Sequence, residues 1–270
     1  MPPQRRKSFR AAVSEAVRYF AAGNVPPSMI PAWIAKLREA ASGFLPSDEE
    51  SKRRIQESLT GIFGKVTRPD RITEYVPKVK AYTIAMVQPE LRAELDRKIR
   101  ESADLIKLRR EDAINRTLAR FQGWMTSVPP SGATRESIAK AQESIIKPIA
   151  QEKYEWRRVT IDQSHKLLAN VASIVAKQNG AIAGVWRSHW RDASYDYRPE
   201  HKERDGKVYA IRGNPAMADG LMRVGPAGYL DAITQPGEEV YCRCWVRYIH
   251  DISELPQDML TAKGKRELSH

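Results

Sequence analysis

The chain has 270 residues, of which 41% are hydrophobic and 29% are charged, and its formal net charge is +12. This length and apolar content are enough to build a core, so a wholly disordered chain is excluded. No window approaches 18 consecutive apolar residues, and the first ten residues lead into a helical pattern that carries Glu15 and Arg18 instead of an apolar signal core. We therefore expect no membrane contact and no secretion.

Helical patterns follow one another through the first 180 residues. Apolar side chains recur every third or fourth position, which is the period of an amphipathic helix. Ser47 and Glu50 have the spacing of a capping box, which predicts a helix start there. The expected helices span residues 8–22, 28–42, 47–60, 89–122 and 134–178, with a kink or short interruption at Pro148.

The helical period stops after Gly180, where glycine and proline become frequent. Gly206 stands in a turn that leads into a short strand, and a second strand is expected from Val240 onward, with Cys242 and Cys244 on one face and Arg243 on the other. The sequence thus predicts an α+β protein: a long, basic, mostly helical N-terminal region over residues 1–180, then a small α+β module with short strands over 181–253. Residues 254–270 are expected to be a flexible basic tail.

The positive charge lies entirely in the helical region. Residues 1–180 contain 32 Lys and Arg against 20 Asp and Glu, a difference of +12, whereas residues 181–270 contain 13 of each. Such an excess favours a polyanionic neighbour, either DNA contacted through its phosphates or an acidic protein surface, although each cluster could equally just solvate a helix. The candidate contacts are Arg5, Arg6, Lys7, Lys107, Arg109, Arg110, Lys153, Arg157 and Arg158.

The C-terminal region contains two short motifs, and their order along the chain is more informative about function than either motif alone. Two tryptophans precede D-x-R-P-E-H-x-x-x-D-G, and P-G-E-E-x-x-C-R-C follows about thirty residues later. This order resembles the C-terminal domain of the phage Mu protein F family, also called the SPP1 gp7-like head morphogenesis family, over residues 181–250. The resemblance is carried by Asp196, Arg198, His201, Asp205, Gly206, Pro236, Gly237, Cys242, Arg243 and Cys244.

The resemblance implies a structural minor head protein of a tailed bacteriophage and no enzyme. Such a protein would join the procapsid in the host cytoplasm and stay in the virion head. Its implied partners are the portal protein, the major capsid protein or both, with packaged DNA and further copies of itself as additional contacts. An internal DNA-binding protein ejected with the genome is the alternative.

The motif also offers candidate metal ligands. His201, Cys242 and Cys244 could hold a structural zinc ion, with Asp196, Asp205 or His189 as a fourth ligand. We expect no cofactor and favour two buried thiols with a hydrogen-bonded histidine, because a C-x-C pair wraps around an ion less easily than C-x-x-C. Many relatives carry C-x-x-C where this chain has Arg198 and His201.

A metal-dependent nuclease or toxin-like domain is the enzymatic alternative. It would use His189, Asp196, His201 and Asp205, which lie close together in the sequence, to activate water on a bound cation. We favour the structural role, because only about twenty residues follow the motif and leave no room for a separate toxin domain.

Overall fold

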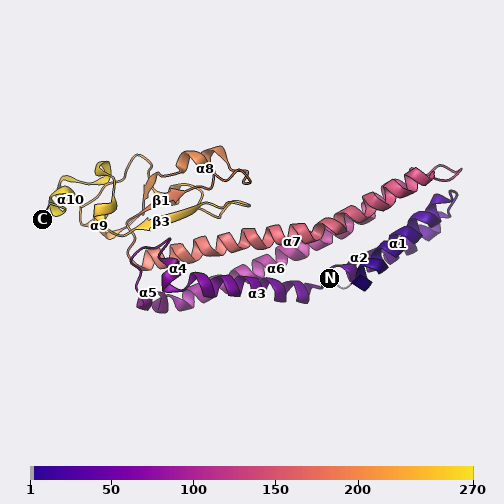
Figure 1. The fold of residues 1–270 in the computed structure, drawn as a ribbon, viewed down its shortest axis with the longest axis horizontal. Helices are drawn as coiled ribbons and strands as arrows, with labels where there is room; N and C mark the ends of the chain where they lie inside the picture. Colours follow the sequence, from indigo (N-terminus) through magenta and orange to yellow (C-terminus); the bar gives the residue numbers. More distant parts are fainter. Residues whose placement is uncertain (1–2, 270) are drawn as a thin grey trace. The chain divides into compact units, whose positions relative to one another are not determined.

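The computed structural model describes residues 3–269, with the side chains of residues 3–7, Pro69 and Ala81 left undescribed. The fold class is α+β, as predicted, with long helices followed by a small sheet (Figure 1). The helices are α1 Pro3–Ala21, α2 Ile30–Phe44, α3 Asp48–Val66, α4 Pro69–Ile72, α5 Ala81–Met86, α6 Gln88–Met125, α7 Arg135–Gln178, α8 Pro199–Arg204, α9 Pro215–Ala218 and α10 Ala262–Glu267. The strands are β1 Ala183–Arg187, β2 Val208–Ala210 and β3 Trp245–Ile249, and short 3₁₀ turns lie at Pro27–Met29, Leu230–Ala232, Ile252–Glu254 and Gln257–Met259.

The chain forms two compact units whose boundaries differ from the expected division at residue 180. Unit 1 comprises residues 1–55 and 100–159, and unit 2 comprises residues 56–99 and 160–270. The division falls inside α3, α6 and α7, so each unit contains part of each of these helices. The expected boundary at residue 180, where the helical period stops, does not separate the two units, because one long helix can contribute to two cores.

Unit 1 is held together by one apolar core. The amphipathic faces of α1 and α2 pack against α6 and α7, and Phe20 meets Phe121 edge-on with ring centroids 5.4 Å apart. α7 continues through Pro148, so the short interruption expected there as the alternative to a kink does not occur. Ile145 and Ile149 on either side are buried, so packing compensates for the backbone hydrogen bond that proline cannot make.

Unit 2 contains an antiparallel sheet in the order β2-β1-β3. Gly184 in β1 lies against Val246 of β3, and a Cβ at Gly184 would come within 2.5 Å of the valine side chain, so only glycine fits there. The backbone N–H of Tyr248 in β3 donates to the carbonyl of Tyr75 at 2.8 Å. The loop before α5 is thereby fastened to the strand.

The C-terminal segment is ordered, contrary to the flexible tail expected for residues 254–270. Leu255, Met259 and Leu260 are buried in the same core as the sheet. The hydroxyl of Thr261 accepts from the backbone N–H of Gly264 and caps α10. The tail is basic at its end, but these three apolar side chains supply enough buried surface to hold it.

No helix in the part of the chain that the structure describes is both long and apolar enough to cross a membrane.

Candidate functional site

The two segments of the motif, residues 196–206 and residues 236–244, meet around His201. This residue lies in α8, which begins after Arg198 with Pro199 in its first turn, where proline's missing N–H costs nothing. Cys242 and Cys244 lie just before β3, which begins at Trp245 and not at Val240 as expected, because Val240 and Tyr241 form a turn. Both sulfurs face His201, as the predicted alternation implied. His201 and the two cysteines are each no more than 3% exposed. The structure thus joins residues that are about forty positions apart.

Each nitrogen of the His201 ring faces a different kind of group. Its Nδ1 lies 3.7 Å from the sulfur of Cys242 and 3.5 Å from the sulfur of Cys244. Its Nε2 lies 2.6 Å from a carboxylate oxygen of Glu239. The Trp186 ring stands edge-on to the imidazole at a centroid distance of 5.4 Å. The imidazole is therefore oriented on three sides.

The pKa values of the two thiols are shifted in opposite directions. A hydrogen bond from the Cys244 thiol, helped by backbone N–H groups and opposed by burial, lowers the pKa of Cys242 to about 5. The same contact and burial raise the pKa of Cys244.

Further contacts tie the two segments together. Arg198 lies 3.5 Å from the Glu239 carboxylate and donates to the carbonyl of Val240 at 3.1 Å. Arg243 does not join this ion pair; its guanidinium lies over the Tyr195 ring, 5.2 Å from the centroid, and its backbone N–H donates to the Tyr195 hydroxyl. Arg198 therefore binds the loop before β3 at Glu239 and Val240, and Tyr195 contacts it at Arg243.

Asp205 has a structural role at the other end of α8. Its carboxylate accepts from the backbone N–H of Ser188 and the indole of Trp190, both at 2.9 Å, and pairs with Arg191 at 3.0 Å. These bonds lower the pKa of Asp205 against the opposing effect of burial. Gly206 follows with a positive φ of 80° and donates to the carbonyl of Trp186 at 2.9 Å, which starts the pairing of β1 and β2.

The helix α7 anchors the second segment. The buried carboxylate of Asp162 accepts from the backbone N–H of Tyr241 at 2.6 Å and pairs with Lys166 at 3.2 Å. Tyr241 has a positive φ of 61°, a conformation that is unusual for a residue with a side chain. Asp162 thus stabilises the backbone turn that aims Cys242 at His201.

Gly237 packs directly on the same helix. Its φ is 79°, and a Cβ there would lie 3.2 Å from the Cα of Lys166. We expect Gly237→Ala to lower the free energy of unfolding by about 2–4 kcal/mol, since a left-handed alanine costs about 1–2 kcal/mol and the helix contact adds to it. Gly206→Ala is the matched control, because Gly206 has nearly the same φ but open space around it. Urea denaturation followed by circular dichroism measures both, and equal losses would contradict the packing of Gly237 on α7.

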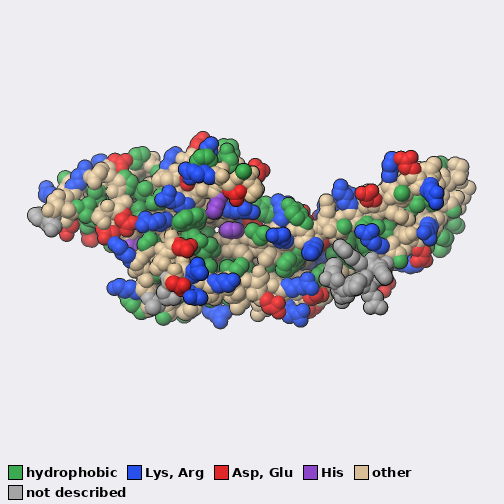
Figure 2. Space-filling view, viewed as in Figure 1, with side chains coloured by type: hydrophobic (Ala, Val, Ile, Leu, Met, Phe, Trp, Pro, Cys, Tyr) green, Lys and Arg blue, Asp and Glu red, His purple; other side chains and the backbone are tan. Residues whose placement is uncertain are grey.

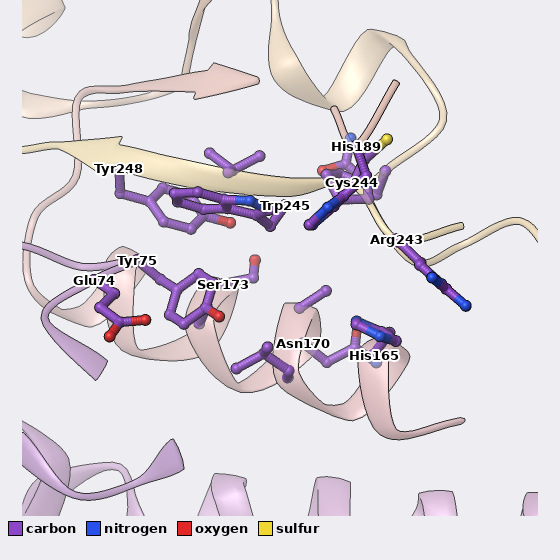
Figure 3. A pocket seen from close by; sticks show the side chains of 16 residues that line it. Glu74, Tyr75, His165, Asn170, Ser173, His189, Arg243, Cys244, Trp245 and Tyr248 are labelled. Atoms are coloured by element: carbon purple, nitrogen blue, oxygen red, sulfur yellow. The ribbon is translucent and has the colours of Figure 1, made fainter. Parts of the chain in front are cut away.

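A cavity of about 330 Å³ adjoins the second segment (Figure 3). It is lined by α7, the loop before α5 and the approach to β3, with His165, Ser173, Tyr75 and Arg243 among its walls. Burial lowers the pKa of His165, with the charge of Arg243 adding to the effect. Cys244 also lines the cavity, and in Figure 3 its sulfur points away from His165 and Ser173.

The acidic residues considered as a fourth metal ligand or as nuclease groups do not join His201. Asp205 is engaged as described, and Asp196 is exposed. Among the described residues, the clusters that could hold a metal are His201 with Cys242 and Cys244, and His201 with Glu200 and Glu239. The proposed set of His189, Asp196, His201 and Asp205 is therefore not assembled in this structure.

The candidate polyanion contacts fall into two groups. Arg110 is largely buried and binds Asp48 at 3.4 Å and the carbonyl of Ser42, so it serves the packing of unit 1. Lys107 also approaches Asp48, at 3.8 Å, and Arg158 pairs with Glu155 at 3.9 Å. The described candidates with exposed side chains are Lys107, Arg109, Lys153 and Arg157. The side chains of Arg5, Arg6 and Lys7 lie outside the described residues.

Two contributors to the site were not singled out from the sequence. Nothing in the sequence indicates that Glu239 contacts His201, from which it lies 2.6 Å. Asp162 lies in a helix 79 positions before Tyr241, and its helical surroundings show nothing of this contact. The signal available in the sequence was the spacing of Asp162 and Lys166, which lie four residues apart on one helix and can form an ion pair.

Comparisons with family models, with curated proteins and with solved structures found no match to this chain.

Proposed function

We propose that this chain is a structural minor head protein of a tailed bacteriophage that takes part in procapsid and head assembly. The observation that carries the proposal is that the two segments with the family-like motif come together in one module, around His201. Residues spaced so far apart acquire a joint role only if they are in contact. The unit 2 module would dock on the portal protein or the major capsid protein.

The proposal assigns no turnover to the motif. The polar groups around His201 lie against one another: the imidazole contacts two thiols and a carboxylate, and that carboxylate also lies 3.5 Å from Arg198. Asp205 is saturated by backbone, indole and guanidinium donors. Because these groups already contact one another, we infer that they stabilise the fold and do not form a site that binds and releases a substrate.

Co-purification with each head protein tests the proposal. The tagged full-length chain would be co-expressed with the portal protein alone, or with the major capsid protein alone, from the same genome. We expect at least one to be retained by the wild type and by a Lys153→Glu/Arg157→Glu variant, and lost with Trp186→Ala, which removes the largest buried side chain of the module. Retention of neither protein by the wild type would contradict the proposal.

An internal DNA-binding role is a second candidate, favoured by the charge of unit 1. This unit holds 22 Lys and Arg against 13 Asp and Glu, a difference of +9, which leaves +3 for unit 2. On the face shown in Figure 2, basic side chains are interspersed with acidic ones and form no continuous patch. Any DNA contact should therefore be weak, independent of base sequence and sensitive to salt.

The DNA contact predicts a charge-specific effect. Lys153→Glu/Arg157→Glu should weaken binding of duplex DNA to the full chain and reduce the slope of log affinity against log salt by about 2, one unit for each lost phosphate contact. Arg187→Glu/Lys207→Glu changes the charge equally at two exposed positions of unit 2 and should have a smaller effect. Filter binding over a salt series measures both, and no wild-type retention at low salt would remove DNA as a partner.

A further inference from the structure

The donor atoms around His201 have the separations of ligands on one metal ion. Tetrahedral zinc, with sulfur at about 2.3 Å and nitrogen at about 2.0–2.1 Å, places its sulfur and nitrogen ligands about 3.5–3.6 Å apart. The imidazole Nδ1 lies 3.5 and 3.7 Å from the two sulfurs. All three ligand atoms lie within 4.8 Å of one another, on fully buried residues.

The histidine is also held in the orientation that a metal ligand needs. The Nε2 atom lies 2.6 Å from a carboxylate oxygen of Glu239, and the Nδ1 atom faces the two sulfurs, so a tautomer with its proton on Nε2 would leave the Nδ1 lone pair free for a metal ion. Metal-bound histidines almost always donate their other ring N–H in this way, which fixes the tautomer and makes the ligand more basic. Trp186 packs against the ring and holds it in place.

The charges of the surroundings suit a divalent ion. Two thiolates would balance the charge of a divalent cation, while the charge of Glu239 is balanced by Arg198 at 3.5 Å. One imidazole and two thiolates form a soft donor set, which selects zinc over magnesium or calcium, both of which require oxygen ligands. The two cysteines lie on one face of an extended stretch and the histidine faces them from α8, so the C-x-C pair does not have to wrap the ion alone.

From this geometry we propose that unit 2 binds one zinc ion through His201 Nδ1, Cys242 Sγ and Cys244 Sγ, with Glu239 as a positioning residue. The ion ties α8 to the approach to β3 and so fastens the two motif segments. The proposal concerns the metal content of the chain and stands apart from the choice of head partner.

Metal analysis of the full-length chain tests the proposal directly. Protein purified without chelator should carry about one zinc per chain through gel filtration. After removal of zinc, cobalt(II) should give the intense visible bands of a tetrahedral site and the near-ultraviolet band of thiolate ligation. Wild-type protein with substoichiometric zinc and no cobalt–thiolate band would overturn the proposal, whatever the variants do.

Variants distinguish ligands from bystanders. Cys244→Ser and His201→Ala should lose the zinc, whereas Glu239→Gln should keep it with an affinity about 10–100-fold lower, as measured by chelator competition. His189→Ala is the control, because His189 lies outside the cluster and should leave the affinity unchanged. An unchanged zinc affinity in Glu239→Gln would contradict the positioning role. This variant keeps the two thiols and the imidazole, so the test remains valid even if the ligand variants fail to fold.

Discussion

Trp186→Ala is expected to lower the free energy of unfolding of unit 2 by about 3–5 kcal/mol, the usual cost of emptying a buried tryptophan site. Trp186 is 0% exposed and is the largest fully buried side chain of the described chain. It lies in β1 opposite Val246, with its ring against His201 and the guanidinium of Arg204 5.1 Å from its centroid. Its removal opens a cavity between the sheet and α8, where the two motif segments meet.

Urea denaturation and amide hydrogen exchange measure this loss and locate it. Protection should fall in β1 and β3, while amides of α1 and α2 in unit 1 keep theirs, because those helices belong to a different core. Trp186→Phe is the matched control and should cost less than half as much, since it retains most of the buried ring. A loss below about 1 kcal/mol for Trp186→Ala would mean that the module is not packed around this side chain.

Glu152 gives unit 1 a stability that should fall as the pH rises. This carboxyl group is 8% exposed, and burial, with the nearby charge of Glu155, raises its pKa from the usual 4.5 to about 7, against the opposing effect of Arg110. The folded state therefore holds the proton more tightly than the unfolded state. Stability is fully present below about pH 4.5 and is lost between that pH and about 7, by about 2 kcal/mol after allowance for solvent screening.

Glu152→Gln should remove this pH dependence, because the amide stays neutral. The variant should unfold at a higher temperature than the wild type above pH 7 and differ little from it at pH 4.5. Glu136→Gln is the control, since Glu136 lies in the first turn of the same helix with its side chain 75% exposed. Thermal unfolding at several pH values measures the effect, and parallel curves for wild type and Glu152→Gln would show that Glu152 is not buried as described.

The local patterns of the sequence were sufficient for the five long helices and for the face that carries Cys242 and Cys244, but they did not predict the short helices α4, α5, α8, α9 and α10. Ser47 caps α3 by accepting from the backbone N–H of Glu50 at 3.1 Å, as the capping box predicted. Cys242 and Cys244 are buried, whereas Arg243 is half-buried, as the alternation predicted. Both predictions depend only on neighbours along the chain, where spacing determines which side chains share a face.

Contacts between distant segments could not be derived in this way. The period of α7 gives its buried face, but it does not show that the helix serves two cores or that Asp162 holds Tyr241. The same holds for Glu239, whose contact with His201 depends on how the loop before β3 is folded. The C-terminal tail was judged by its charge, whereas Leu255 and Met259 determine its structure by packing beneath the sheet.

Deletion of the gene tests the proposed role in phage head assembly most directly. Particles would be counted by electron microscopy and their infectivity measured, with the intact gene supplied in trans as the control. The account predicts that heads without this chain are aberrant, empty or non-infectious, and that the intact gene restores them. Normal numbers of filled, infectious heads in its absence would contradict it.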